Sequence, residues 1–384
     1  FVYFCSVIKN NYELQNDGTM KNILSKRTFI VLPLFLFSLH PLWGQKSNFK
    51  NDICIPGKLY MLSDIRNDVF VEALIKRWRP YNDFVRFSGD CVYSRKLNRV
   101  ASVDTPVDGS NMKIELVNSD EFEIIKEKAI SICVGKKGIG TQEVTVQILG
   151  DSFVNGAFFR DALLSKNYIP GIKLVGLRNI KNEEGQYDEG RGGWTVKKYF
   201  EIPKGEMTSY HGYMQPVGEY RYWGSCEFWK NCYKVINGEL TDTEIVYNCG
   251  RYDQCITKFD KETGYLAAPK KNDLMYDNAR GSFMVYTEKK WKNVEVDERK
   301  WAFNYRKYLD MWNLDAPKFF AQMLGLNDYR DSLTADYREW NKKIAEMKES
   351  YYKAVPDGKF IILIPCTTCG SLNNIRGDFT LRQN

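Results

Sequence analysis

Short apolar runs separated by polar turns fill the chain from residue 53 to residue 146. In KLYML, DFVRFSG and MKIELV, apolar and polar positions alternate or nearly so. Strands of this length, repeated at short intervals, predict an antiparallel β-sandwich of the immunoglobulin type. No grouping of acid, base and nucleophile stands out among them. We therefore expect residues 45–140 to form a small all-β accessory domain that is structural or contacts carbohydrate.

The pattern changes after Thr141, where apolar strands begin to alternate with helix-like segments. A β-branched run ends at Gly150, and the stretch FVNGAFFRDALLSK behind it has the apolar spacing of an amphipathic helix. The same alternation returns in APKFFAQMLGLND, TADYREWNKKIAEMKESYYKAV and KFIILIP. It predicts a parallel sheet with helices on both faces, whose active site lies at the carboxyl ends of the strands. Two polar clusters, residues 150–152 and 325–328, fall at such ends.

A long segment of weak periodicity, at about residues 200–300, interrupts this alternation. It is rich in aromatic residues, as in YHGYMQ and YRYWGSCEFWKNCYKV. Loops of this length inside a compact domain are either functional or disordered. The aromatic residues and cysteines favour an ordered insertion that shapes a substrate cleft.

Composition narrows the class of protein only slightly. Hydrophobic residues make up 43% of the chain and charged residues 27%, which is typical of a folded globular protein. The formal charge of +7 is spread along the chain instead of being gathered in a basic block. With no groove-reading motif present, we do not expect nucleic-acid binding. The sequence does not determine the oligomeric state.

The N-terminal region resembles an export signal. Lys21, Lys26 and Arg27 precede an apolar run at residues 29–39, so residues 20–44 have the layout of a signal peptide. We expect residues 1–19, which precede Met20, to be upstream sequence that is not part of the protein. The apolar run is shorter than the roughly 20 residues of a membrane span. No cysteine follows it closely. We expect a secreted or periplasmic bacterial protein, beginning at Gln45, without a stable membrane anchor.

Ten cysteines, nine of them beyond the signal peptide, suit an oxidising compartment. Cys226, Cys232, Cys249 and Cys255 are close in sequence and suggest disulfides within the insertion, in a pairing that the sequence leaves open. Separately, the C-x-x-C spacing of the cysteines at residues 366 and 369 suggests a redox function. It follows a strand-like segment and lacks the helix start that activates such thiols, so we do not favour that role.

Three motifs together resemble the conserved blocks of SGNH (GDSL) hydrolases. They are VQILGDS at residues 146–152, EGRGGWT at residues 189–195 and MLGLND at residues 323–328, in the family's order. The resemblance covers about residues 141–365. It implies an α/β domain over residues 141–384 with the SGNH, flavodoxin-like, three-layer α/β/α architecture, C-terminally incomplete.

The same resemblance implies the site residues. Ser152 is the nucleophile, and its hydroxyl needs an adjacent base and donors for the developing oxyanion. The oxyanion hole combines the Ser152 backbone N–H with the Gly193 backbone N–H and the Asn327 side chain, with Gly192 as the alternative donor to Gly193. The supporting residues are Gly150, Asp151, Gly325 and Asp328, of which the two aspartates hold loops by hydrogen bonding.

Each of these positions also has a purely structural explanation. Ser152 is a suitable N-cap for the following helix. Gly193 suits a tight turn of positive φ. Asn327 is a common turn residue, and Asp328 is a common helix cap.

One departure from the family is serious. SGNH enzymes carry their catalytic Asp and His in a late D-x-x-H block, and this sequence contains none. Its histidines are His40, in the signal peptide, and His211, which precedes the third block and is expected to contact substrate or stabilise a loop instead of acting as the base. We expect the chain as given to be inactive because it is truncated. A degenerate, inactive family member is the alternative.

The leading hypothesis for function is acyl-ester hydrolysis through a Ser152 acyl-enzyme. Export, the accessory domain and the aromatic insertion favour an acylated glycan as substrate, although lipid and thioester substrates stay open. A noncatalytic carbohydrate-binding or surface protein on the same scaffold is the second hypothesis, and an extracellular thiol oxidoreductase is the third. No cofactor or metal is expected, since the Cys and His spacings match no zinc pattern.

Overall fold

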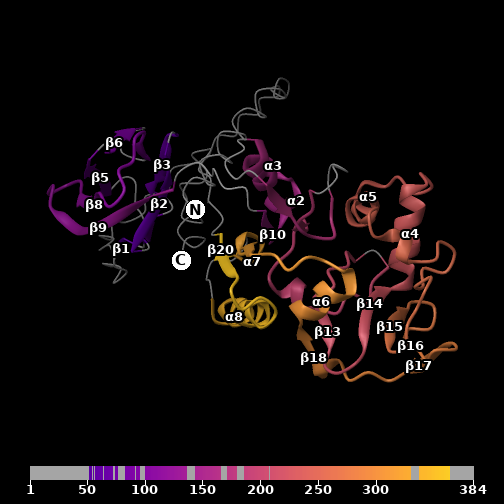
Figure 1. The fold of residues 1–384 in the computed structure, drawn as a ribbon. Coiled ribbons are helices and arrows are strands. Elements are labelled where there is room, and N and C mark those ends of the chain that lie inside the picture. Colours follow the sequence, from indigo (N-terminus) through magenta and orange to yellow (C-terminus); the bar gives the residue numbers. More distant parts are fainter. Residues whose placement is uncertain are drawn as a thin grey trace, which may run out of the picture. The chain divides into compact units, whose positions relative to one another are not determined.

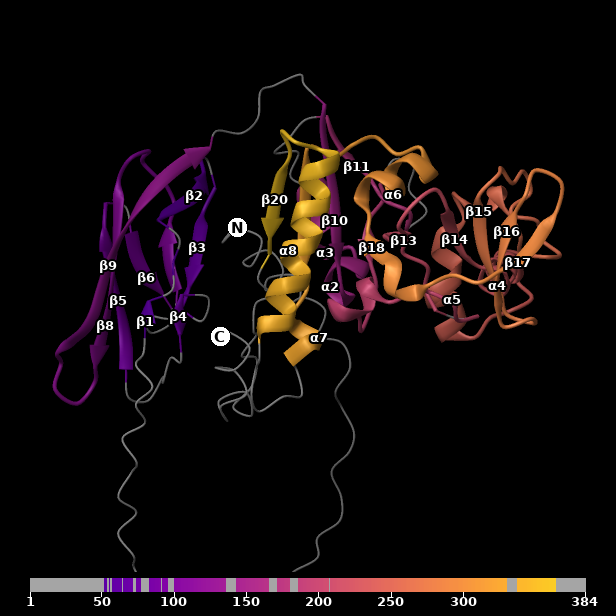
Figure 2. The ribbon, with the colours of Figure 1, turned by 90° about the horizontal axis from the view of Figure 1, so that it is seen from below.

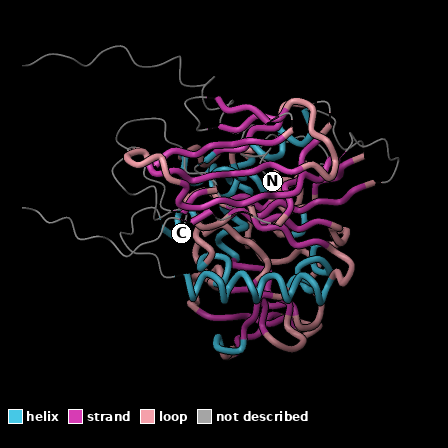
Figure 3. Tube along the Cα trace, turned by 90° about the vertical axis from the view of Figure 1, so that its left-hand side faces the viewer, coloured by secondary structure: helices cyan, strands magenta, loops and turns pink. Residues whose placement is uncertain are grey.

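The computed structural model describes two compact units, divided between Val134 and Gly135 (Figure 1). The described residues are 52–53, 55, 57–63, 65–71, 74–76, 83–90, 92–95, 100–135, 143–165, 171–179, 186–206, 208–329 and 337–363. The expected signal peptide, the expected boundary between residues 140 and 141, and Cys366 and Cys369 lie outside these residues. Within them strands predominate over helices, as Figure 3 shows.

The described residues of the N-terminal unit form three sheets. Its strands are β1 (Asp52–Ile53), β2 (Lys58–Leu62), β3 (Asn67–Phe70), β4 (Ile75–Lys76), β5 (Asp83–Gly89), β6 (Val92–Arg95), β7 (Val100–Val103), β8 (Asn111–Asn118) and β9 (Ile124–Gly135). The sheets have the strand orders β2-β9-β8-β5, β3-β7-β6 and β1-β4. Strands β5, β8 and β9 pair antiparallel, as do β3, β7 and β6.

One hydrophobic core joins these sheets. In β5, Val85 and Phe87 are buried while Arg86 is exposed, because successive side chains of a strand point to opposite faces. Met112 and Ile114 of β8 lie in the same core. The strands predicted from KLYML, DFVRFSG and MKIELV are confirmed. Strand β6 was not predicted, because its sequence VYSR is too short to show an alternation.

The C-terminal unit is organised around a parallel sheet, which confirms the predicted mixed α/β architecture with a parallel sheet. Its strands are β10 (Val144–Gly150), β11 (Ile172–Leu174), β12 (Glu189–Gly190), β19 (Phe319–Met323) and β20 (Lys359–Ile362). The strand order is β11-β10-β19-β20, β12 also pairs with β10, and every pairing is parallel. Numbered by their position along the chain, the four strands of this path lie in the order 2-1-3-4, with β10 as strand 1 and β19 as strand 3. The direction of the strand order therefore reverses between β10 and β19.

The register brings the candidate motifs to one edge. Gly150 at the end of β10 pairs with Met323 at the end of β19 and with Gly190 of β12. All three strands therefore end side by side, and the loops that follow them leave from the same edge of the sheet. Ligands of open α/β sheets bind at the carboxyl edge, where the strand order reverses.

One face of the sheet packs on aromatic side chains. Gln147 and Phe320 lie on this face, where Gln147 Nε2 donates to the hydroxyl of Tyr308 in α6 (Tyr305–Trp312) at 3.1 Å. Helix α8 (Tyr337–Ala354) runs alongside the sheet (Figure 2) and packs Tyr351 on Phe320, with 5.5 Å between ring centroids. These contacts fix the sheet beneath the motif loops.

The segment expected to form one helix after Gly150 forms two short helices, so that prediction was wrong in part. They are α2 (Ser152–Asn155) and α3 (Phe158–Ser165). Between them Ala157 has a φ of 63°, in the left-handed region, where a right-handed helix cannot continue. The Gly156 N–H donates to the Ser152 carbonyl at 2.8 Å and ends α2.

The aromatic insertion is ordered in its described residues. It contains a two-stranded antiparallel sheet, β13 (Met214–Pro216) with β18 (Trp301–Phe303), and a sheet of order β14 (Arg221–Ser225), β15 (Asp273–Asp277), β16 (Ser282–Tyr286) and β17 (Trp291–Val294). Its helices are α4 (Cys226–Ile236) and α5 (Thr243–Cys249), with 3-10 turns η2 (Lys197–Phe200), η3 (Gly250–Tyr252), η4 (Ile256–Lys258) and η5 (Glu298–Lys300).

Stacked aromatic rings form the interior of this insertion. Trp229 is fully buried and stacks on Phe259, with ring centroids 4.0 Å apart. Such offset or stacked pairs contribute beyond their buried area. Across both units, none of the described helices has the length and apolar character that a membrane crossing requires.

Candidate functional site

Ser152 is the first residue of α2, and its side chain is exposed. The N-cap is the preceding Asp151, whose Oδ1 accepts a hydrogen bond from the Phe153 N–H at 3.1 Å. Capping therefore does not explain Ser152, because Asp151 already performs it. Within the described part of the chain, no side chain bonds the Ser152 hydroxyl. An exposed, unengaged hydroxyl at a strand-to-helix turn is available to a ligand.

Gly150 ends the strand before Ser152 and allows a close approach. A Cβ at Gly150 would meet the Val154 side chain at 2.5 Å and the Met323 carbonyl oxygen at 2.7 Å. Either contact is too short for a real side chain, so only glycine lets α2 turn back over β10 and β19. The position of Ser152 depends on this glycine.

Gly193 is exposed, has a φ of 72° and has no atom within 4 Å of the place where a Cβ would stand. The positive φ explains the glycine. The open space around it leaves room for a ligand. Gly192, the alternative oxyanion donor, is more enclosed, because the Tyr247 hydroxyl lies directly against it. These surroundings favour Gly193 as the residue that a substrate reaches.

Asn327 brings the three motifs together. It lies in α7 (Leu326–Tyr329), which follows β19 and Gly325. Its Nδ2 donates to Asp151 Oδ2 at 3.3 Å and to the Trp194 carbonyl at 3.1 Å. The amide thus bridges the first and second motifs. Since both amide hydrogens are engaged, a role as oxyanion donor requires one of these bonds to be exchanged for the ligand.

The two aspartates hold loops together, as the sequence suggested. Both carboxylate oxygens of Asp328 accept from the Val196 N–H, at 3.0 and 3.2 Å, and so tie the third motif to the second. Burial raises the pKa of Asp151 from 3.8 to about 6, and repulsion from Asp328 adds to the rise. Burial likewise raises the pKa of Asp328 to about 6. Neither carboxyl is placed to activate Ser152 by a bond in this structure.

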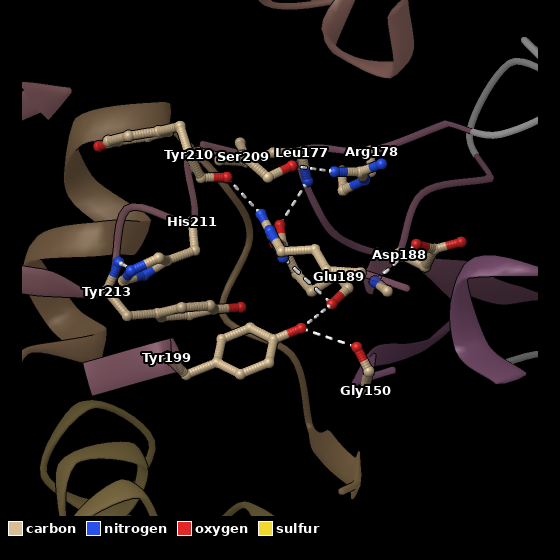
Figure 4. Close-up of polar contacts among 12 residues, drawn as sticks. Gly150, Leu177, Arg178, Asp188, Glu189, Tyr199, Ser209, Tyr210, His211 and Tyr213 are labelled. Carbon is tan, nitrogen blue, oxygen red and sulfur yellow. Dashed lines mark hydrogen bonds and ion pairs between the residues drawn. The ribbon is translucent and has the colours of Figure 1, made fainter. Parts of the chain in front are cut away.

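The loop of the second motif is bound to the strand that carries Ser152. The Gly150 carbonyl accepts from the Arg191 N–H at 2.9 Å. The Tyr199 hydroxyl lies 2.8 Å from that carbonyl and 2.7 Å from the Glu189 carbonyl, and it donates to one or the other (Figure 4). The loop that presents Gly193 is therefore fixed relative to Ser152 through backbone contacts.

A buried ion pair lies beneath this loop. Arg191 Nη1 is 2.8 Å from Glu189 Oε2, and both side chains are at most 1% exposed. Glu189 Oε1 accepts from the Leu177 N–H (Figure 4) and from the Tyr308 hydroxyl, each at 2.6 Å. Arg191 Nη2 donates to the Tyr210 carbonyl at 2.6 Å. Charges so deeply buried are tolerated only when they are paired and hydrogen-bonded, as these are.

Sequence reasoning did not assign this pair, although a clue was present. Glu189 and Arg191 stand two residues apart at the end of a strand, and residues with that spacing share a face. Two opposite charges on the inner face of a buried strand predict an ion pair.

His211 is not placed to act as a base. It is 1% exposed, its Nε2 lies 3.0 Å from the Glu201 carbonyl, and its Nδ1 accepts from the Tyr213 N–H at 3.2 Å. These partners define the neutral tautomer with the proton on Nε2. Burial first, and then the charge of Arg191, lower its pKa to about 3. His211 therefore stabilises its loop as a neutral ring (Figure 4).

The four cysteines of the insertion are buried free thiols in the structure. Cys232 of α4 and Cys249 of α5 are in side-chain contact, and burial raises the pKa of the Cys232 thiol. The disulfides expected from the sequence remain a proposal. Among the described residues, no group of His, Cys, Asp or Glu side chains is arranged to hold a metal ion.

Comparison with known proteins adds no family to this geometry. A scan against protein-family models finds no match, and searches of curated proteins and of solved structures find none either. Three residues define the chemistry that the site offers. They are an exposed serine, a glycine with free space around it, and an amide that links their two loops.

Proposed function

We propose that the protein is a secreted serine ester hydrolase of the SGNH type, a carbohydrate acyl esterase that works through an acyl-enzyme on Ser152. The observation that carries the proposal is the position of Asn327, whose amide joins Asp151 to Trp194. Three motifs far apart in sequence meet within hydrogen-bonding distance. Turns and helix caps in unrelated places would not produce this meeting.

The sheet supports the same function. Ser152 follows β10 and Asn327 follows β19, the neighbouring strands between which the strand order reverses. Open α/β sheets bind ligands at such a reversal of the strand order. The flavodoxin-like, three-layer SGNH architecture and the immunoglobulin-like character of the N-terminal unit are part of the proposal.

In the proposed reaction, the Ser152 hydroxyl attacks the ester carbonyl and loses its proton to a base, and the alcohol leaves as the acyl-enzyme forms. Water then attacks the acyl-enzyme and releases the acid. The Ser152 and Gly193 backbone N–H groups and the Asn327 amide stabilise the oxyanion of each tetrahedral intermediate, as donors aimed at developing charge do. Substrate binding displaces one existing bond of Asn327.

The proposal requires a histidine base and its carboxylate partner. SGNH enzymes carry them in a D-x-x-H segment, and this sequence contains none. His211 does not replace it, because both ring nitrogens are engaged in a buried site. This observation favours a second candidate, a noncatalytic glycan-binding protein on the same scaffold. The thiol oxidoreductase hypothesis gains no support from the described residues.

The test is ester hydrolysis by the protein expressed from its complete coding sequence, starting at Gln45. The substrates are p-nitrophenyl acetate and acetylated xylan. The variants are Ser152→Ala and, as a matched control, Ser110→Ala, whose hydroxyl bonds the Val107 carbonyl in an exposed turn of the N-terminal unit. We expect Ser152→Ala to lower kcat by about a thousandfold or more, and Ser110→Ala to leave it unchanged.

Equal rates for wild type and Ser152→Ala would contradict the esterase. Binding of xylan that survives in Ser152→Ala, without hydrolysis by either protein, would establish the second candidate.

A further inference from the structure

Two arginines converge on one amide in the helix that carries Ser152. Asn155, at the end of α2, accepts from Arg178 Nη2 at 3.4 Å through its side-chain oxygen. The same oxygen accepts from Arg251 Nη1 in a short contact, and the Asn155 carbonyl accepts from Arg251 Nη1 at 3.0 Å. Arg178 lies near the sheet, whereas Arg251 comes from η3 of the insertion. The insertion is therefore attached to the nucleophile helix through Arg251.

Neutral groups accept the hydrogen bonds of these two positive charges. Arg178 donates to Ser209 Oγ at 2.5 Å and to the Tyr247 carbonyl at 2.9 Å. Across the described part of the chain, no carboxylate lies within ion-pair distance of either arginine. The charge of Asp188 acts on both arginines without an ion pair, and burial raises the pKa of that carboxyl to about 6. Burial, followed by repulsion from Arg178, lowers the pKa of Arg251 to about 10.

Tyr247 connects Arg251 to the loop of the expected oxyanion hole. The Arg251 guanidinium lies over the Tyr247 ring, 5.0 Å from the centroid. The Tyr247 hydroxyl in turn lies against Gly192, next to Gly193. Arg251 is half-buried, whereas Arg178 is 1% exposed, so Arg251 is the member of the pair that a ligand reaches. Its Nη1 is held by Asn155, while no partner of its Nε or Nη2 occurs in the described segments.

We propose that Arg251, positioned by Asn155 and Tyr247, binds a negatively charged group of the substrate, the carboxylate or sulfate of an acidic sugar. The inference rests on the proposed function, because it places this group beside the ester attacked by Ser152. A guanidinium recognises such planar or tetrahedral oxyanions through several hydrogen bonds at once. The bound anion supplies a counter-charge in direct contact with the guanidinium, which none of the described protein groups provides.

A merely structural Arg251 would behave differently. If the guanidinium only fastens η3 to α2, its loss would weaken the binding of neutral and acidic sugars to the same extent. If it binds the anion, its loss would remove the preference for acidic sugars. The ratio of the affinity for an acidic sugar to the affinity for a neutral sugar distinguishes the two roles. A change in folding lowers both affinities alike and so leaves this ratio unchanged.

The test measures binding to the Ser152→Ala protein, which keeps ligands intact. Sodium glucuronate, glucose 6-sulfate and glucose are compared by saturation-transfer NMR and calorimetry, with Arg251→Gln and the charge-conserving Arg251→Lys. We expect an acidic sugar to bind better than glucose, in a salt-sensitive manner. Arg251→Gln should lower its affinity relative to glucose about tenfold or more, as for a lost charge-assisted bond. Arg251→Lys should retain part of the preference.

Preferential binding of glucuronate would assign the charged group as a carboxylate, and preferential binding of glucose 6-sulfate would assign it as a sulfate. Equal binding of all three sugars, or an equal loss for acidic and neutral sugars in Arg251→Gln, would overturn the inference. Because this assay needs no catalysis, its outcome is independent of whether Ser152 hydrolyses esters. If Arg251→Gln does not fold, the salt dependence of glucuronate binding to the parent protein decides in its place.

Discussion

The side-chain amide of Asn327 lies 3.3 Å from Oδ2 of Asp151, the residue that caps the Ser152 helix. A second bond from the same nitrogen reaches the Trp194 carbonyl. The three loops at the carboxyl edge of the sheet therefore form one assembly. Residues in and beneath this assembly contribute to catalysis and to stability by different interactions, and each interaction leads to its own prediction.

Replacing Asn327 with Ala should reduce kcat for p-nitrophenyl acetate by about a hundredfold to a thousandfold, the cost of losing one oxyanion donor. KM should change little, because the donor acts on the transition state. Steady-state kinetics measure both parameters. The control is Asn293→Ala, which removes an exposed amide on β17. A rise in KM at constant kcat would show that Asn327 binds ground-state substrate instead.

Asp328 should control the pH dependence of stability. Asp151 and Asp328 have folded pKa values of about 6, raised from 3.8, so the folded protein binds more protons than the unfolded protein between these values. Stability therefore falls as pH rises through this window. Asp328→Asn removes one titrating group and relieves the repulsion on Asp151. Urea unfolding should show the variant gaining stability relative to wild type as pH rises from about 4 to about 6, and a pH-independent difference would be inconsistent with the raised pKa values.

Breaking the buried Glu189–Arg191 pair should be costly. Arg191→Met leaves the Glu189 carboxylate buried without its partner, and we expect a loss of about 3–5 kcal/mol in the free energy of unfolding. Adding Glu189→Gln to that variant should recover part of the loss, because the unpaired charge is gone. The exposed pair Lys204–Glu298 is the comparison, where Lys204→Met should cost about 1 kcal/mol or less. Denaturant titration measures all four proteins.

Cys232 and Cys249 should form a disulfide when the protein folds in an oxidising compartment. Their side chains are in contact between α4 and α5. Exchange with the disulfide of an oxidoreductase would oxidise the pair before burial closes access, and the two electrons and two protons leave the oxidoreductase as a dithiol. Peptide mapping of unreduced protein should find the Cys232–Cys249 cross-link. Two alkylatable thiols at these positions, or a cross-link from either one to Cys255 or Cys226, would refute this pairing.

The sequence predicted the parts of this fold that depend on local pattern. Residues 144–150 and 319–323 were recognisable as strands, and strand ends identify one edge of a parallel sheet, so Ser152 and Asn327 were expected to lie near each other. The break between α2 and α3 was not predictable in this way. It depends on a left-handed conformation at Ala157, a residue whose side chain gives no indication of it.

Contacts between segments that are distant in the chain also could not be predicted from the sequence. Arg251 meets Asn155 across 96 positions of the chain, and nothing in the pattern of either segment specifies the other. The insertion is rich in aromatic residues, which predicted order but not the face it presents to the site. Only the packing of the insertion determines that Tyr247 lies against Gly192 and that Arg251 contacts α2.

The most direct test of the account is covalent labelling of Ser152 by a fluorophosphonate in the protein expressed from its complete coding sequence. The serine oxygen displaces fluoride from phosphorus, so the adduct reports an activated hydroxyl. We predict a single phosphonyl adduct on the peptide containing Ser152, absent from Ser152→Ala and retained in Ser110→Ala. A protein that stays unlabelled, or that is labelled equally in Ser152→Ala, would contradict the assignment of Ser152 as nucleophile.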